Sequence, residues 1–311
     1  MTKQPPRLSN DHWVSKGYQK HFADNMHRVA IIDAHRRKVI TTRPIKKNFC
    51  RRGFTTYLDQ TGRTNRELEL AFSGVEGHML NQIRSITPAN CGPEKKAAVA
   101  NLFAVHMVRS PAFKTMHERI LRDFRANQVP NYATEPKLAV MFAAQYGREP
   151  KEGEIQQIAL SSYDRMASDP AMAVNTTSRQ HDQIAERLNN YYMQLIIVNP
   201  ELPGFAIGDV PVIHAQTYSG RHGFRDHLAV GDANLILGPL SRRMAACFSA
   251  KPFQTSILTS AEAVDTVNAV FIRAALNEVA CHPEDSEHLA AVSNRLDQLP
   301  IERLLIATAG T

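Results

Sequence analysis

The stretch from Tyr191 to Phe253 constrains the fold most, because it has the pattern of a sheet within a chain dominated by helical periodicity. It contains the runs YYMQLIIVN, FAIGDVPVI and ANLILGPLSRRMAACF, with Gly and Pro between them. Short aliphatic and aromatic runs bounded by turn formers are typical of strands. We therefore expect a small antiparallel sheet over about residues 191–258, with helices packed on one side of it.

Helical spacing fills most of the remaining chain. Thr64-Asn-Arg-Glu67 has the form of a capping box, and the apolar positions from Leu68 to Ile86 then recur every three or four residues. A helix is expected to begin at Pro93 and another at Pro111, with a loop over residues 127–134. Further helices are expected over residues 136–146, 151–167, 177–190, after Ser260, and over 284–298.

The N-terminal region predicts a different local structure. Residues 1–11 are polar and are expected to be loose, and residues 12–22 form an anchoring segment with Tyr18 and Phe22. The β-rich runs 28–32 and 38–42 flank a polar turn, which predicts a short hairpin. The whole chain is predicted to be a mostly helical α+β domain over residues 12–311, with a loose division near residue 190 as an alternative.

Composition and charge limit the class of protein. A hydrophobic content of 43% with 22% charged residues is typical of a globular protein, and no apolar run is long enough for a membrane helix. Four cysteines without CxxC spacing, and no apolar leader, predict a cytoplasmic protein without a disulfide frame. The composition does not indicate a cofactor.

The net charge of +7 is partly local to one short segment. Its basic residues are Arg36, Arg37, Lys38, Arg43, Lys46, Lys47, Arg51 and Arg52. Such a strip can neutralise phosphates, which is the part of nucleic-acid binding that does not depend on sequence. A solvated basic face without a partner is the alternative.

Three charged residues stand out by their placement. Arg109 follows Leu102 and Val105 on the apolar stripe of its helix, so its guanidinium must be paired or must line a polar pocket. Glu76 lies between two glycines beside another apolar stripe. Asp209, in Gly-Asp-Val-Pro, could face a ligand or could cap its own turn. The structural alternatives are a tie from Arg109 to the following Ser-Pro turn and a boundary salt bridge for Glu76.

Other chemistry is less well supported by the sequence. A crowded stretch of imidazoles and carboxylates could hold a divalent metal and serve a metal-dependent hydrolase, although its spacing matches no standard motif. These residues are His214, His222, Asp226, His227 and Asp232. The chain has no GxSxG, Walker, GxGxxG or HExxH motif, which argues against ordinary serine hydrolases, nucleotide-driven motors and Rossmann dehydrogenases.

Several short islands together resemble the bacterial domain of unknown function family 4238. They are His12-Trp-Val14 with Tyr18 and Phe22, Val75-Glu76, Arg109-Ser-Pro111, residues 205–212, Pro239-Leu-Ser241 and Asn268. Ser15, Gln19, Gly208 and Arg242 depart from the family pattern. The resemblance implies no reaction; it implies a set of pocket residues and an intracellular bacterial accessory protein, with a pointer to toxin or phage-defence biology.

These observations lead to two hypotheses. In the first, His12, Glu76, Arg109 and Asp209 converge in a polar pocket that binds or cleaves RNA or a nucleotide, with His12 as general acid or base and Arg109 on the phosphate. In the second, the protein is not an enzyme, the polar residues form a structural network, and the basic hairpin docks a protein or a nucleic acid. A dry, mutually paired cluster would favour the second.

Overall fold

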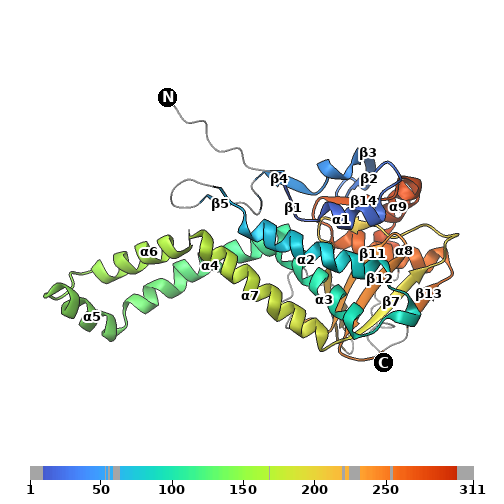
Figure 1. The fold of residues 1–311 in the computed structure, drawn as a ribbon. Helices are drawn as coiled ribbons and strands as arrows, with labels where there is room; N and C mark the ends of the chain where they lie inside the picture. The colour runs from blue at the N-terminus through green and yellow to red at the C-terminus, as the bar shows by residue number, and fades with distance from the viewer. Residues whose placement is uncertain are drawn as a thin grey trace.

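The computed structural model describes residues 10–52, 54, 57–58, 64–167, 169–218, 221–223, 232–252 and 255–299. Most of the loose N-terminus expected over residues 1–11 lies outside this part of the chain, whereas Asn10 and Asp11 begin a strand. The architecture is α+β, as the sequence predicts (Figure 1).

A six-stranded sheet forms the centre of the fold and lies where the sequence predicts it. Its strands are β7 (Tyr192–Val198), β9 (Ile213–Tyr218), β10 (Arg221–Gly223), β11 (Leu235–Ser241), β12 (Met244–Ser249) and β13 (Ser256–Leu258). Their order is β10-β9-β11-β12-β7-β13, antiparallel throughout except for the parallel pair of β7 and β13.

Both faces of the central strands β11 and β12 are buried, which corrects the expectation of helices on one side only. Along β12, Ala246 and Phe248 join the core formed with the helices before the sheet, whereas Ala245 and Cys247 join the core formed with the helix that follows it. Successive side chains of a strand point to opposite faces, so a continuous apolar run indicates burial on both. The unbroken aliphatic runs of this region already carried that information.

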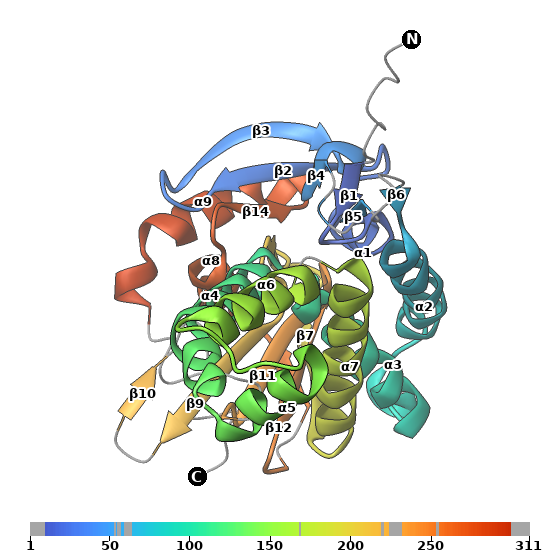
Figure 2. The same cartoon turned by 90° about the vertical axis from the view of Figure 1, so that its left-hand side faces the viewer.

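A second sheet extends the predicted N-terminal hairpin. The hairpin is present as β2 (Arg28–Asp33) and β3 (Lys38–Pro44), and β2 also pairs with β14 (Glu278–Cys281), which pairs with β8 (Ile207–Gly208). Two strands distant in sequence therefore complete the sheet, in the order β3-β2-β14-β8. Strand β3 is its outer edge and is exposed along most of its length (Figure 2).

Eight longer helices lie in the described part of the chain. The helices are α2 (Glu67–Arg84), α3 (Pro93–Val108), α4 (Pro111–Ala133), α5 (Pro136–Tyr146), α6 (Glu154–Ala167), α7 (Pro170–Asn189), α8 (Ala261–Ala274) and α9 (Ser286–Asn294). A single-turn helix, α1 (Lys16–Gln19), and a 3-10 turn, η1 (Lys20–Phe22), form the anchoring segment, in which Tyr18 and Phe22 are fully buried.

Two local predictions are wrong. Residues 127–134 do not form a loop, because α4 continues through Pro130 to Ala133. The expected capping box does not form either: Thr64 lies in strand β6 (Thr64–Asn65), and α2 begins at Glu67 after Arg66, which makes no side-chain cap. In both places strand pairing or helix propagation overrides a local signal.

Helices α4, α5 and α6 form an arm that projects away from the two sheets, with α5 at its tip (Figures 1 and 2). Helices α4 and α6 pack against each other along the arm. Helix α7 then leads back and packs against α3 beside the central sheet.

Candidate functional site: a buried ionic cluster beside β1

The cluster forms where the N-terminal strand β1 (Asn10–His12) meets α2 and α3. Glu69, Phe72 and Glu76 follow one another on α2 at spacings of three and four residues, so they share one face of that helix. Arg109 is the C-terminal cap of α3, an end of the helix that favours a cation. The sequence therefore brings two carboxylates and a ring against one guanidinium.

The Arg109 side chain is 1% exposed, and its contacts run mainly through the two terminal nitrogens of the guanidinium. Its Nη2 donates to the His12 carbonyl and to Glu69 Oε2, the latter at 2.9 Å. Its Nη1 lies 3.1 Å from Glu76 Oε1, and its guanidinium lies over the Phe72 ring, 5.3 Å from the centroid. Two carboxylates thus compensate the buried cation, as the energetics of buried charge require.

His106 adds a neutral imidazole to the cluster. It is fully buried, stacks on Tyr18 with ring centroids 4.6 Å apart, and its Nδ1 lies 3.3 Å from the Trp13 carbonyl. A carbonyl only accepts, so Nδ1 carries the proton, and Nε2 presents a lone pair 3.5 Å from Glu76 Oε1. Burial and the Arg109 cation lower the pKa of His106 to about 3.

The pKa of Glu76 is shifted in the opposite direction from that of His106. Burial raises the pKa of its carboxyl to about 7, although Arg109 and a hydrogen bond from Ser15 favour the charged form. A pKa of about 7 allows both protonation states of Glu76 near neutral pH, with His106 Nε2 3.5 Å from its Oε1. In the described part of the chain, Glu76 Oε1, His106 Nε2 and Arg109 Nη1 are close together but none is aligned for a hydrogen bond.

His12 belongs to the same cluster through its backbone more than its ring. Its carbonyl accepts from Arg109, and its strand pairs with Cys50 of β4 (Cys50–Arg52). The ring is buried, and its Nε2 donates to the Lys46 carbonyl at 3.2 Å. Burial, followed by the Lys16 cation, lowers the pKa of this imidazole.

Asp209 lies apart from the other three. Its Oδ1 accepts from the Leu276 amide at 2.7 Å, and its Oδ2 accepts from the Asn277 amide at 2.9 Å and from the Asn277 side chain at 3.1 Å. Both oxygens therefore bind the turn between α8 and β14. Burial raises the pKa of Asp209, while these hydrogen bonds lower it. The structure brings together His12, Glu76 and Arg109 and leaves Asp209 as a cap on a distant turn.

Other residues of the family islands also satisfy backbone groups. The Tyr18 hydroxyl donates to the Pro239 carbonyl, and Asn268 donates to the Gly204 carbonyl while its oxygen accepts from the Ala206 amide. Each of these residues is fully buried or nearly so. Tyr18, Asn268 and Asp209 thus each bind backbone groups of a segment distant in the sequence.

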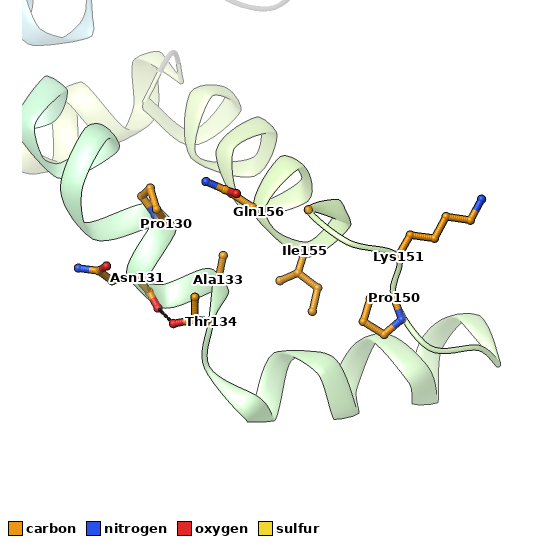
Figure 3. Close-up of a pocket in the computed structure, with 9 residues that line it drawn as sticks. Pro130, Asn131, Ala133, Thr134, Pro150, Lys151, Ile155 and Gln156 are labelled. Atoms are coloured by element: carbon orange, nitrogen blue, oxygen red, sulfur yellow. Dashed lines mark hydrogen bonds between the residues drawn. The ribbon is translucent and has the colours of Figure 1, made fainter.

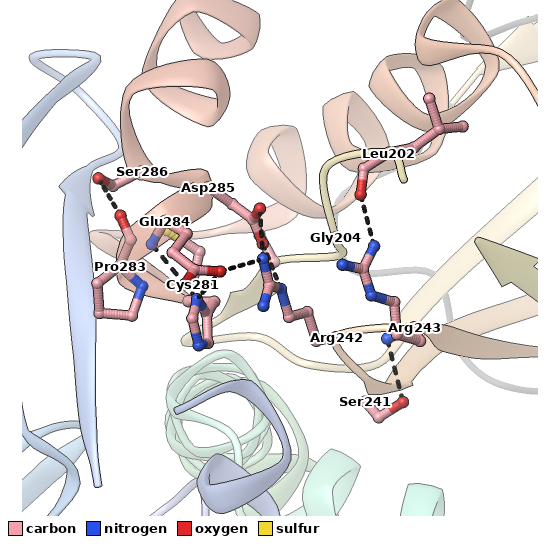
Figure 4. Close-up of polar contacts among 12 residues, drawn as sticks. Leu202, Gly204, Ser241, Arg242, Arg243, Cys281, Pro283, Glu284, Asp285 and Ser286 are labelled. Atoms are coloured by element: carbon pink, nitrogen blue, oxygen red, sulfur yellow. Dashed lines mark hydrogen bonds and ion pairs between the residues drawn. The ribbon is translucent and has the colours of Figure 1, made fainter. Parts of the chain in front are cut away.

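Arg242, which stands where the family has Pro, makes an ionic contact of its own (Figure 4). Its guanidinium binds Asp285 through two hydrogen bonds of 2.8 and 3.0 Å and Glu284 through a third of 3.0 Å. The main chain of Gly204 packs so closely here that a β-carbon would lie 2.7 Å from the Arg242 carbonyl. This departure replaces a rigid turn residue by an ion pair that joins the β11–β12 turn to the segment after β14.

The basic residues of the predicted strip fall into two groups at opposite ends of the hairpin. Arg36, Arg37 and Lys38 lie at the β2–β3 turn, where Arg36 approaches Asp33 at 3.9 Å and Arg37 approaches Asp297 at 3.7 Å. Arg43 is withdrawn from the surface, since it binds Glu278 and Asn48.

The second group is denser and exposed. Lys46 and Lys47 lie in the 3-10 turn η2 (Ile45–Lys47), and Arg51 and Arg52 lie in β4. None of the four forms an ion pair with a described residue. We refer to these four residues as the basic end of the hairpin.

The proposed metal site has no counterpart in the described part of the chain, where no three His, Cys, Asp or Glu side chains are grouped to hold an ion. Asp226 and His227 lie outside the described residues. Over that same part of the chain, no helix is both long and apolar enough to cross a bilayer.

The cluster side chains are Glu69, Phe72, Glu76, His106 and Arg109. Of these, sequence reasoning did not single out Glu69 or His106. Glu69 stands seven residues before Glu76 on the same helical face, so the helix periodicity could have found it. His106 lies three residues before Arg109, but α3 is buried on nearly every side from Ala98 to Val108. An apolar stripe could not single out the histidine in such a helix.

The fold and the cluster define an α+β protein in which buried polar residues hold an N-terminal strand against two helices. Residues 10–285 match the family described as protein of unknown function (DUF4238), and the chain belongs to this family. The resemblance seen in the sequence is therefore confirmed. No match was found among curated proteins or among solved structures.

Proposed function

We propose that this protein is a non-enzymatic binding protein that docks a nucleic acid through the basic end of its hairpin. The observation that carries the proposal is the group Lys46, Lys47, Arg51 and Arg52, which is exposed and forms no ion pair with a described residue. Exposed cations without counter-ions attract a phosphate backbone and release its condensed ions on binding. The surface therefore fits a polyanion bound without base recognition.

The position of the two basic groups extends this surface. Strand β3 has seven residues, so it separates the β2–β3 turn from the basic end by about 20 Å, roughly the length of six phosphates of one duplex strand. Arg36 and Lys38 are exposed at the far end. A backbone lying along the β3 edge would meet cations at both ends of the strand.

The buried cluster is a poor site for cleavage, which leaves binding at the exposed surface as the better-supported function. The side chains of His106, Arg109 and Glu76 are 0%, 1% and 6% exposed, and Arg109 already contacts two carboxylates and a carbonyl. A phosphate would have to displace Glu69 or Glu76 to reach it. The cluster instead fixes β1, which pairs with β4 and so positions the basic end.

Binding to fluorescent single-stranded RNA and duplex DNA, followed by anisotropy over a series of salt concentrations, tests the proposal. The variant Lys46→Ala/Lys47→Ala/Arg51→Ala/Arg52→Ala should bind at least ~10-fold more weakly at low salt. The slope of log affinity against log salt should fall by up to about 3.6 for duplex DNA, which is four contacts at about 0.9 each.

The matched control is Arg122→Ala, which removes an exposed arginine from α4 and should leave both the affinity and the slope unchanged. Equal loss in the control, or no binding by the wild type at low salt, would refute the proposal. Competition by polyglutamate at the same charge concentration would favour an acidic protein partner instead. RNA cleavage that depends on Glu76 would restore the catalytic hypothesis.

A further inference from the structure

The arm of α4, α5 and α6 has too little core for an element that stands away from the body. Residues 111–167 are all described, and only Val129, Phe142 and Tyr163 among them are buried. The longest helix of the arm, α4, has 23 residues and a single buried one. Helices in proteins gain most of their stability from packing an apolar face. The paired helices α4 and α6, with α5 at their tip, therefore lack a packing partner.

Apolar side chains that would form the missing core are exposed along the arm. Val140 and Met141 on α5 are 70% and 64% exposed. Further large apolar side chains are exposed on the three helices, namely Ile120, Phe124, Tyr132, Tyr146, Ile158 and Met166. Ile120 and Phe124 are one helical turn apart on α4 and so share a face. A concentration of this kind marks an interaction surface.

The charge of the arm favours a second copy of this chain as the occupant. Residues 111–167 carry eight Lys and Arg and seven Asp and Glu, a net charge of +1, so +6 of the chain's +7 lies elsewhere. A surface with almost no net charge does not repel a copy of itself, whereas the bodies of two copies carry most of the positive charge and repel each other. Contact through the arms also keeps the positively charged bodies apart.

A cavity near the tip adds a geometric reason (Figure 3). It has a volume of about 370 Å³ and lies between the last turn of α4 and the start of α6. Its lining includes the apolar Pro130, Ala133, Pro150 and Ile155. The two helices thus separate at the tip and leave room that an inserted apolar side chain would fill.

We propose that the arm is a dimerisation hairpin that binds the arm of a second copy of this chain. The two arms lie side by side in antiparallel orientation about a two-fold axis, which completes a helical bundle and places the bodies at opposite ends. The exposed residues of α4, α5 and α6 form its core. This inference does not depend on nucleic-acid binding.

Multi-angle light scattering and sedimentation velocity over a range of protein concentrations test the inference. The wild type should be a dimer. The variant Ile120→Glu/Val140→Glu/Met141→Glu should dissociate at least ~10-fold more readily, because each substitution places a charge in the proposed core. Far-ultraviolet circular dichroism of the same samples shows whether the helices of the arm persist.

The matched control is Leu70→Glu, because Leu70 is 66% exposed on α2, outside the arm; this variant should remain dimeric. A wild type that is monomeric at every concentration would refute the inference. So would a dimer that survives the triple substitution with its helices intact, since its interface would then lie elsewhere. Nucleic-acid binding by the monomeric variant would leave the proposed function standing, which separates the two tests.

Discussion

The buried cluster around Arg109 and the basic end of the hairpin use similar residues in opposite ways. Arg109 is dry and is compensated by Glu69 and Glu76, whereas Lys46 and Arg51 are exposed and form no ion pair with a described residue. A buried charge must be paired to be tolerated, while an exposed cation keeps its attraction for an external anion. The first region therefore contributes to stability, and the second is the one for which we propose binding.

Strand β1 connects the two regions. His12 receives a hydrogen bond from Arg109 at its carbonyl and pairs with Cys50 next to Arg51. Loss of the cluster should therefore disturb the surface indirectly, whereas loss of the surface should leave the cluster intact.

Arg109→Ala should have the largest effect. Removing one partner of a buried ion pair costs about 3–5 kcal/mol, because Glu69, Glu76 and the His12 carbonyl lose a shared donor. Chemical denaturation at pH 8 measures the loss in unfolding free energy. Arg109→Lys should recover part of it, since one ammonium can meet only part of the three-way contact. A loss within the error of the measurement would remove the structural role assigned to the cluster.

Asp209→Ala should have the second largest effect and should leave binding unchanged. The substitution leaves the Leu276 amide and two Asn277 donors without their acceptor, at a cost of about 2–4 kcal/mol. Asp209→Asn retains one acceptor oxygen and should cost less. Denaturation measures the stability of both variants, and RNA binding is measured on the folded fraction. A fall in binding without a fall in stability would contradict this assignment.

The sequence predicted the elements better than their assembly. The strands over residues 191–258, the hairpin and the helical spacing follow from local periodicity, and the structure contains them. The pairing of β2 with β14 joins segments some 250 residues apart, and nothing in either strand specifies the other. Local patterns fix the type of an element, whereas the choice of neighbour depends on the packing of the whole chain.

The candidate site shows the same limit. Arg109 was identified because a guanidinium on an apolar stripe needs a partner, and the structure supplies Glu76 and Glu69. The convergence of Asp209 with this group was expected from shared family islands, but its oxygens bind the α8–β14 turn. A strand-end aspartate that caps a turn and one that faces a ligand have the same local sequence.

Glu76→Gln should change stability in a manner that depends on pH. The folded-state pKa of Glu76, about 7, lies above its ordinary 4.5, so the native state holds this proton more tightly. The stability that Glu76 contributes is therefore present at low pH and is lost as the pH rises from about 4.5 to about 7. The unfolding free energy of the variant should therefore rise relative to that of the wild type by about 1–3 kcal/mol over that pH range.

The pH dependence that His106 adds to the unfolding free energy has the opposite sign, so the wild type and the Glu76→Gln variant must be compared at each pH. Its pKa is lowered from 6.5 to about 3, so its contribution is present above about 6.5 and is lost as the pH falls. The wild type should show a shallow profile between pH 5 and 6.5 because the two slopes oppose. Denaturation curves of wild type and Glu76→Gln at several pH values measure the difference, and a constant difference would exclude the raised pKa.

Replacing the four cations of the basic end by alanine should have the smallest effect on stability. These side chains are exposed and form no ion pair with a described residue, so the unfolding free energy should change by no more than about 0.5 kcal/mol. A small gain is also consistent with reduced self-repulsion in a chain of net charge +7. Denaturation beside the binding assay then separates the two regions: binding lost at full stability assigns the cations to a ligand. A loss of several kcal/mol would instead show that they hold β4 in place, and the division between structural and binding charges would fail.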